Sequence, residues 1–343
     1  MRNAIRAVVA EMEPPSADAR AAAIAEAGSQ EVNDHLQDSW PCLNTIEIRD
    51  PPTDLPRPSS FTVASWNIER CKRIEDSAEV IRAAGADIVL ATEMDHGMAR
   101  SGQRHTTRDL AALLAFVYVF GTESVELGTC AVYSTGLFRE VPNRHDLHGN
   151  AILSRYPLAA PALVPVEDGG FWFTGAPKGD DQLRIGGRMA ITAQIEAASG
   201  PVTFAAVHYE SESDADGRAD QGQRLVEGIA RLYGTGPCVI GGDLNTRAFS
   251  DAGWDRADIL SWPEQIEPTF ARFGIAGFDW RGANTGLPTT RAAPGRPVDY
   301  PLKTLDWLFT RGLSAGDARI LPAVSRRGDY LSDHELITAR IVP

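Results

Sequence analysis

The stretch from Cys238 to Thr246, which reads Cys-Val-Ile-Gly-Gly-Asp-Leu-Asn-Thr, constrains the fold more than any other part of the chain. A short apolar run that ends in two glycines is typical of a buried strand leading into a turn. Successive side chains of an extended backbone point to opposite sides, so Asp243 and Asn245 are predicted to share one side, away from Leu244. A buried strand therefore delivers two polar groups to one place at its carboxyl end.

The same pattern, an apolar strand followed by a polar residue, recurs at three other places. They are Phe61–Trp66 before Asn67, Asp87–Thr92 before Glu93, and Val202–Val207 before His208. The first two strands flank a predicted helix, so Asn67 and Glu93 are expected at the same ends of two strands. One polar residue at a strand end more often forms a plain turn than a site, whereas several together favour a site.

Two further polar positions lie near the end of the chain. Asp306 lies inside the apolar stretch Thr304–Phe309, and a buried aspartate needs an ionic or hydrogen-bonding partner. Asp333 and His334 come directly before the last alternating strand, Leu336–Ile341. Taken alone, Asp306 reads as a structural residue that caps a turn, and the same plain interpretation applies to His208.

Composition places the chain among ordinary globular proteins. It is 43% hydrophobic and 23% charged over 343 residues, and it contains no apolar run long enough to span a membrane. The four cysteines are scattered and form no zinc or redox motif, which predicts a reducing, cytoplasmic environment.

The net charge of −13 bears on the choice of substrate. Proteins that bind nucleic acid tightly through many phosphates usually carry basic clusters, and none stands out here. The charge therefore favours a small substrate, although a basic cleft on an acidic protein would still allow a nuclease.

Residues 1–60 are predicted to form a helical N-terminal extension with a proline-rich linker, and residues 61–343 the main domain. Within the extension, Met1–Pro15 has the spacing of a short amphipathic helix, and acidic residues and prolines interrupt any signal-peptide core. Ser16–Ala27 predicts a helix, and Asn44–Arg49 alternates as an edge strand does.

Three polar or glycine-rich segments are predicted as loops. Residues 94–107 contain Asp95, His96, Arg100, Arg104 and His105, which form either a solvated loop or a rim that contacts a substrate phosphate. Residues 167–187 carry Phe171, Trp172 and Phe173, which either form a lid or tuck into the body. Residues 280–303 carry Arg281, Arg291, Arg296 and Lys303, a candidate positive wall.

Seven motifs occur in a recognisable order. They are Trp66-Asn67-Ile68, Thr92-Glu93, Gly149-Asn150-Ala-Ile-Leu-Ser-Arg155, Val207-His208, Gly242-Asp243-Leu244-Asn245, Leu305-Asp306-Trp307 and Ser332-Asp333-His334. From Phe61 to the C-terminus, the chain resembles the endonuclease/exonuclease/phosphatase superfamily in this order of motifs. The resemblance implies an α+β fold, a four-layer sandwich in which helices cover two packed, mixed β-sheets.

The resemblance also implies roles for individual residues. Glu93 would be the main carboxylate ligand of Mg²⁺ or Mn²⁺, with Asn67 and Asp333 completing the cluster. Asp243 would orient or deprotonate the attacking water, and Asn245 would hold that water or a phosphate oxygen. His208 and His334 would contact the phosphoryl oxygens, and Asp306 would orient His334. Asn150 is left open between a functional role and bracing its turn.

These roles predict a metal-dependent phosphoester hydrolase, a phosphodiesterase or phosphatase, with a small or lipid-derived substrate. A nuclease of the same fold and a catalytically silent binding module are the alternatives. The inositol-phosphatase group usually has Trp-x-x-Asp-Arg near the Asp306 position, and the segment Lys303-Thr-Leu-Asp-Trp here argues against that group.

Overall fold

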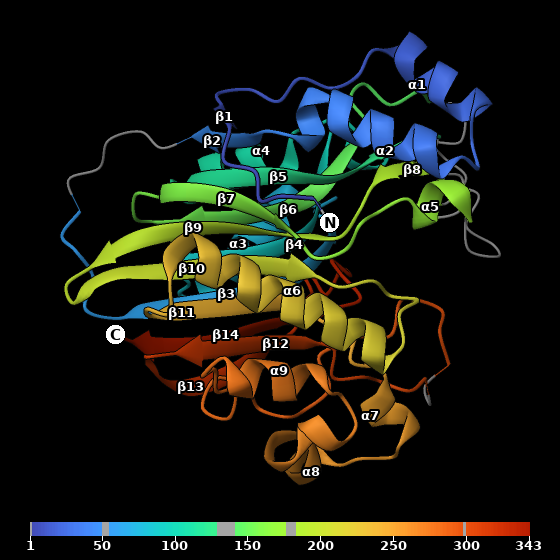
Figure 1. The fold of residues 1–343 in the computed structure, drawn as a ribbon. Helices are drawn as coiled ribbons and strands as arrows, with labels where there is room; N and C mark the ends of the chain where they lie inside the picture. Colours follow the sequence, from blue (N-terminus) through green and yellow to red (C-terminus); the bar gives the residue numbers. More distant parts are fainter. Residues whose placement is uncertain (1, 50–54, 129–140, 176–182, 298–299) are drawn as a thin grey trace.

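Two β-sheets packed face to face form the centre of the protein (Figure 1). The computed structural model describes residues 2–49, 55–128, 141–175, 183–297 and 300–343. In the larger sheet the order is β1 (Val8–Val9), β2 (Ile46–Arg49), β5 (Val117–Glu126), β6 (Leu147–Ser154), β4 (Ile88–His96), β3 (Phe61–Arg70), β14 (Leu336–Val342) and β13 (Ser314–Leu321), with β8 (Arg184–Gly186) paired to β5. In the smaller sheet it is β12 (Asp306–Arg311), β11 (Cys238–Asp243), β10 (Gly200–His208), β9 (Met189–Ala197) and β7 (Ala159–Pro165).

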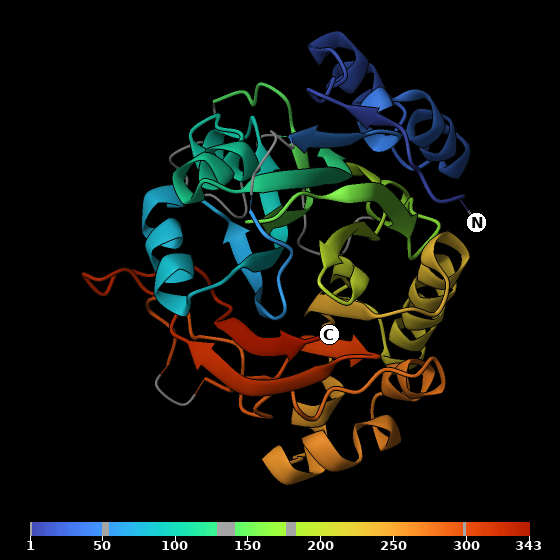
Figure 2. The same ribbon diagram turned by 90° about the vertical axis from the view of Figure 1, so that its left-hand side faces the viewer.

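Helices cover the outer faces of both sheets, and Figure 2 shows them on opposite sides of the strands. The larger sheet is covered by α3 (Ile74–Ala84) and α4 (Thr106–Leu114), and the smaller by α6 (Ala215–Tyr233) and α9 (Thr269–Ile275). Both sheets mix parallel and antiparallel pairs: β3 is parallel to β4 and antiparallel to β14 in the larger sheet, and β10 is parallel to β11 and antiparallel to β9 in the smaller. The predicted α+β sandwich of two mixed sheets is confirmed.

Three apolar layers hold the sandwich together. The central layer lies between the sheets and includes Val63, Leu90, Ile191 and Phe204, each fully buried. One outer layer joins the larger sheet to α3 and α4, and the other joins the smaller sheet to α6 and α9. Most strands are therefore buried on both faces, which explains their nearly continuous apolar sequences.

Several elements follow directly from local sequence. Helix α3 ends at Gly85, which adopts the left-handed conformation (φ 68°) that glycine tolerates at a helix C-terminus. Ser16 caps α1 (Ala17–Ala25) by accepting a hydrogen bond from the Ala19 amide. Strands β9 and β10 form an antiparallel hairpin. The shorter helices are α2 (Gln30–Ser39), α5 (Phe171–Thr174), α7 (Ala248–Asp251) and α8 (Arg256–Ser261), with 3₁₀ turns at Pro41–Leu43, Ala99–Ser101 and Pro263–Gln265.

The prediction of an amphipathic helix at Met1–Pro15 was wrong. In residues 2–15 the structure has the short strand β1, where the Ala7 carbonyl accepts a hydrogen bond from Ile46, and Ile5 bridges to Leu163. Pairing with the two sheets satisfies these backbone groups, which a helix would have satisfied internally.

The predicted strand at 44–49 is present as β2, but its prediction as an edge strand was wrong, because β2 pairs with β1 on one side and β5 on the other. The extension thus adds strands to the larger sheet, and a domain boundary at residue 60 stays a prediction. Within the described ranges, no helix combines the length and apolarity needed to cross a membrane.

Candidate active site

Neighbouring strand ends bring the predicted polar residues together, at the carboxyl ends of β10 and β11 and the amino end of β12. In the smaller sheet, His208 pairs in register with Asp243 across the parallel strands β10 and β11. Asp243 pairs with Asp306, the first residue of the antiparallel strand β12. The three side chains therefore form one row across three strands, facing Asn67 and Glu93 from the larger sheet.

Both glycines before Asp243 are required by close approach of neighbouring groups. A Cβ atom on Gly242 (φ 156°) would lie 1.7 Å from the Val207 carbonyl oxygen. A Cβ atom on Gly241 would lie 2.7 Å from Leu90 of the opposite sheet. The Gly-Gly pair thus lets β11 lie close to its neighbour β10 and to the opposite sheet just before Asp243.

Asp243 lies at the centre of the site. Its Oδ2 atom is 3.1 Å from Asn67 Nδ2, 3.5 Å from His208 Nε2 and 3.6 Å from His334 Nε2. Its Oδ1 atom accepts a hydrogen bond from the Asn245 amide at 2.9 Å. Burial raises the pKa of Asp243 to about 6; His334 opposes this shift, and Asp306 adds to it.

His334 is held as a cation. Its Nδ1 atom lies 2.8 Å from Asp306 Oδ2, which also accepts a hydrogen bond from the Thr289 hydroxyl at 2.6 Å. Burial alone would lower the pKa of His334, but the charges of Asp306 and Asp243 outweigh it and raise that pKa well above its ordinary value. Nδ1 therefore donates to Asp306, and a second proton on Nε2 faces Asp243.

His208 is held in the opposite, neutral state by burial and by Arg188. Arg188 Nη1 lies 3.0 Å from His208 Nδ1, and because a guanidinium has no acceptor, this nitrogen must be unprotonated. Burial, followed by the charge of Arg188, lowers the pKa of His208 well below its ordinary value. The single proton of His208 thus lies on Nε2, which faces Asp243.

Arg188 is itself fixed by two buried carboxylates, and it was missed in the sequence because it follows a glycine-rich loop rather than a strand. Its guanidinium pairs with Glu123 Oε1 at 2.5 Å and Glu210 Oε2 at 3.2 Å. Asn150 donates to Glu123 at 3.2 Å and to the Met189 carbonyl at 3.0 Å. Asn150 therefore braces the side of the site that holds Arg188.

Asn245 follows β11 in a left-handed conformation (φ 50°), and its side chain donates to the Tyr209 carbonyl at 3.0 Å. Short polar residues such as asparagine tolerate this conformation best. The turn keeps Asn245 buried beside Asp243, and its contact with water or a phosphate oxygen stays a prediction.

Comparison with known proteins identifies the family. The model of the endonuclease/exonuclease/phosphatase family matches residues 64–334. The chain belongs to the endonuclease/exonuclease/phosphatase family. No curated protein matches the sequence.

Solved structures agree with the family in their fold. An endonuclease/exonuclease/phosphatase protein from Beutenbergia cavernae is 22% identical, with a TM-score of 0.53 over 84% of this chain and 72% of its own. The human Nocturnin catalytic domain, solved with a sulfate anion, is 20% identical, with a TM-score of 0.54 over 86% and 96%. A D. rerio TDP2 complexed with single-strand DNA product is 13% identical, with a TM-score of 0.52 over 83% and 100%.

Members of this family are generally metal-dependent phosphoester hydrolases, and the carboxylates of Glu93 and Asp333 fit Mg²⁺ because they offer oxygen atoms. Burial raises the pKa of Asp333, His334 opposes this, and Glu93 adds to it. Asp333 and Asp243 are thus two carboxylates whose charged forms burial disfavours, and a divalent cation beside them would favour those charged forms. Asn67 donates its amide to Glu93 at 3.2 Å and to Asp243, while its oxygen accepts from the Glu69 amide.

Arg70 is a departure that the sequence did not predict. It pairs with Glu93 at 2.7 Å, reaching it through a bend in which Glu69, Arg70 and Cys71 all have positive φ (44°, 69° and 49°). Burial alone would raise the pKa of Glu93, but Arg70 and nearby histidines outweigh it and hold that pKa well below its ordinary value. A metal ion bound by Glu93 would either share the Glu93 carboxylate with Arg70 or displace Arg70 from that carboxylate.

Both interpretations of residues 94–107 were wrong, since Asp95, His96, Arg100 and His105 are buried. Arg100 forms two 2.8 Å hydrogen bonds to Asp95 and also pairs with Glu126 at 2.9 Å. The buried charges of this segment are thus compensated inside the protein, and they do not form a solvated loop or a rim. Arg104 is half-buried and pairs with Glu75 and Asp109 outside the segment.

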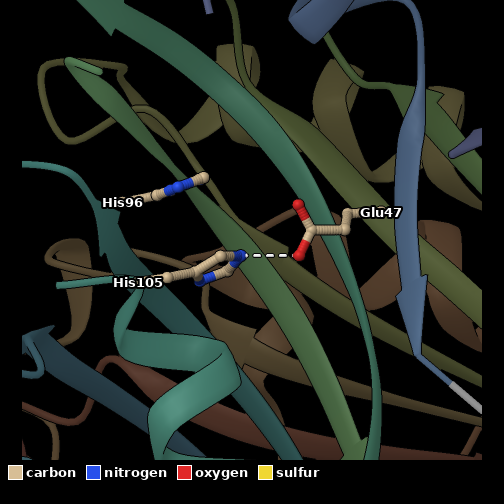
Figure 3. Close-up of side chains that lie close together, drawn as sticks. All are labelled: Glu47, His96 and His105. Carbon is tan, nitrogen blue, oxygen red and sulfur yellow. Dashed lines mark hydrogen bonds and ion pairs between the residues drawn. The ribbon is translucent and has the colours of Figure 1, made fainter. Parts of the chain in front are cut away.

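A second group, Glu47, His96 and His105, also offers metal-binding atoms within 4.8 Å of one another (Figure 3). The His96 and His105 rings are stacked, with centroids 3.9 Å apart and planes 19° apart. A metal ion lies near the plane of each imidazole that binds it, so nearly parallel, stacked rings do not meet at one ion. Glu47 instead accepts hydrogen bonds from His105 (2.8 Å), Tyr118 (2.6 Å) and the Met12 amide (2.7 Å), which joins the N-terminal extension to the main domain.

The other two predicted loops, 167–187 and 280–303, agree with the predictions in part. In the described part of 167–187, Trp172 and Phe173 are buried, so they tuck into the body, whereas Phe171 is 45% exposed. Residues 176–182 lie outside the described ranges. The described part of 280–303 forms neither helix nor strand, as predicted, and its residues Arg291, Arg296 and Lys303 line a cavity beside His334.

Proposed function

We propose that the protein is a divalent-metal-dependent phosphoester hydrolase, a phosphodiesterase or phosphatase. The observation that carries this proposal is the contact of one buried carboxylate, Asp243, with two histidines held in different protonation states. Both histidines present an Nε2 proton to the same point, so a phosphoryl group there would meet two donors and one acceptor.

Asp243 is suited to orient a water molecule and accept its proton, because a raised pKa near 6 makes it a base that works near neutral pH. His334 is suited to stabilise the charge that develops on the phosphoryl oxygens, and its ion pair with Asp306 keeps it charged. A donor positioned in this way typically contributes roughly 3–4 kcal/mol to transition-state stabilisation. His208 supplies a second, neutral donor on the other side of Asp243.

Glu93, Asn67 and Asp333 are the residues that we propose hold the ion. When bound, Mg²⁺ or Mn²⁺ would supply charge neutralisation of the phosphoryl oxygens and make a bound water more acidic. The residues of the chain contribute the orientation, since the site is buried and braced from both sheets.

We propose a small or lipid-derived phosphoester as the substrate, in preference to nucleic acid. The net charge of −13 supports this choice, since a long anionic polymer would be repelled by most of the surface. A cytoplasmic location also stays part of the proposal; the buried thiols of Cys42, Cys71 and Cys238 are compatible with it.

Hydrolysis of bis-p-nitrophenyl phosphate in Mg²⁺ or Mn²⁺ tests the proposed reaction. Activity should be lost in EDTA and return with added metal, and Asp243→Asn and His334→Ala should each lower kcat by at least about 100-fold. Asp258→Asn, at an exposed position of α8, is the matched control and should retain full activity.

Full activity in EDTA would refute the metal-dependent mechanism. Parallel incubation with plasmid, single-stranded DNA, RNA and phospholipid head-group esters ranks the substrate classes. Cleavage of nucleic acid alone would reverse the preference for a small substrate.

A further inference from the structure

A basic cavity opens directly beside the catalytic residues. Its volume is about 300 Å³, and at one end it reaches Asn245, Asp333 and His334. The rest of its lining includes four cationic side chains, those of Arg247, Arg291, Arg296 and Lys303.

Among the described residues, the four cations of the cavity outnumber the carboxylates beside them, which are Asp333 in the lining and Glu335 paired with Arg291. Arg291 pairs with Glu335 at 2.7 Å, and Arg296 lies over the Tyr300 ring at 5.4 Å. Within the described ranges, neither Arg247 nor Lys303 takes part in an ion pair, and both are half-buried. In a protein of net charge −13, four cations around one small cavity are an arrangement that favours an anionic ligand.

The cationic side of the cavity (the basic wall, formed by Arg247, Arg291, Arg296 and Lys303) is connected to the catalytic residues through backbone hydrogen bonds. The Arg291 amide donates to the Asp333 carbonyl at 2.6 Å, and the Lys303 carbonyl accepts from the Thr289 amide at 2.8 Å. The hydroxyl of the same Thr289 donates to Asp306, which orients His334. An anion bound by the wall would thus be held at a fixed position relative to the phosphoryl group under attack.

We propose that this cavity binds a second phosphate of the substrate, so that the enzyme prefers small phosphoesters that carry an additional phosphate group. The inference rests on the proposed function and specifies its substrate class. The volume fits a small polar group and is at the lower end for ligand pockets, so it does not fit a duplex. Three arginines and a lysine favour a dianionic phosphate over a single carboxylate, since the phosphate carries twice the charge and offers more oxygen atoms to the donors.

Three chromogenic substrates that differ in their second charge test the proposal. Thymidine 5′-(p-nitrophenyl phosphate) has no second charged group, its 3′-phosphorylated derivative has an anionic one, and p-nitrophenylphosphorylcholine has a cationic one. The native protein should cleave the 3′-phosphorylated compound with a kcat/KM at least about 10-fold above that of the first, and the choline ester least well.

Arg247→Gln and Lys303→Gln should each reduce the preference for the 3′-phosphorylated substrate about 10-fold, mainly through KM. Arg281→Gln is the matched control, because Arg281 belongs to the same segment but lies exposed over Trp280, outside the cavity. It should leave the preference unchanged. Equal loss on all three substrates in Arg247→Gln and Lys303→Gln would overturn the proposal.

A binding experiment separates this inference from the proposed function. Calorimetric titration with thymidine 3′,5′-bisphosphate and with thymidine 5′-phosphate should show tighter binding of the bisphosphate, and Lys303→Gln should remove the difference. If the protein hydrolyses none of the three substrates but keeps this preference, the proposed reaction fails and the phosphate site stands. If hydrolysis occurs without any preference for the second phosphate, the reaction stands and the site is refuted.

Discussion

Replacing Arg188 tests the proposed origin of the neutral state of His208. The guanidinium donates to His208 Nδ1 at 3.0 Å and compensates the buried carboxylates of Glu123 and Glu210. In Arg188→Met the imidazole loses its fixed donor, so it can rotate, change tautomer or take up a second proton. Removing the nearby positive charge also removes one of the causes that depress the pKa of His208, so that pKa should rise.

The magnitudes follow from two separate losses. A hydrogen bond from a charged donor contributes roughly 1.5–3 kcal/mol, which corresponds to a 10- to 100-fold lower kcat if all of it acts on the orientation of His208. Removing one partner of a buried ion pair costs about 3–5 kcal/mol of stability, so Tm should fall by roughly 10 °C. The double variant Arg188→Met/Glu123→Gln should recover part of the lost stability, because it removes a buried carboxylate that has lost its partner. It should not recover kcat.

Nitrogen NMR of ¹⁵N-labelled histidine measures the tautomer, and kcat is measured on the same samples. In the native protein at neutral pH, His208 should have an unprotonated Nδ1 and a protonated Nε2, and the double variant should show a mixture of forms. Arg231→Met, at an exposed position of α6, is the control and should change neither readout. A proton on His208 Nδ1 in the native protein, or a double variant with native kcat, would refute the reasoning.

Three further predictions concern Asp306 in the site, Gly242 in the strand before Asp243, and His96 beside the contact between the N-terminal extension and the main domain. Asp306→Asn should lower the pKa of His334 towards its ordinary value, so the alkaline limb of the kcat/KM profile should move to lower pH; an unchanged limb would contradict the charged state of His334. Gly242→Ala should destabilise the protein by at least about 3 kcal/mol in chemical denaturation, whereas Gly236→Ala, with open space around its Cβ position, should cost under about 1 kcal/mol; similar values for both would contradict the close contact. Burial lowers the pKa of His96 to about 3, below its unfolded value of about 6.5, so the neutral His96 contributes fully to the free energy of unfolding above pH 6.5, and this contribution is lost as pH falls towards 3. His96→Phe should therefore reduce the fall in the free energy of unfolding over this pH range by up to about 4 kcal/mol. An unaltered pH dependence would count against the pKa shift.

The amino-acid sequence alone determined the strands of the site and the polar residues at their ends. The signals are local: an apolar run, a glycine turn and a polar residue at fixed spacing, as in Gly242-Asp243-Leu244-Asn245. The structure brings His208, Asp243 and Asp306 together as these signals imply, because they lie opposite one another on neighbouring strands of the smaller sheet. His334 reaches them from just before β14 of the larger sheet, which packs against the smaller one.

Only the tertiary structure decided which partners these residues have. Burial and Arg188 together lower the pKa of His208, and Arg70 pairs with the Glu93 carboxylate; the sequence motifs marked neither arginine. Asp95 and Arg100 belong to a segment that the local sequence predicts as a polar loop. They are buried because β4, which contains Asp95, pairs with β6, and β6 pairs with β5. Charge compensation, pKa and the shape of the basic cavity depend on distances between residues that are far apart in the chain, and those distances are set by how the two sheets pack.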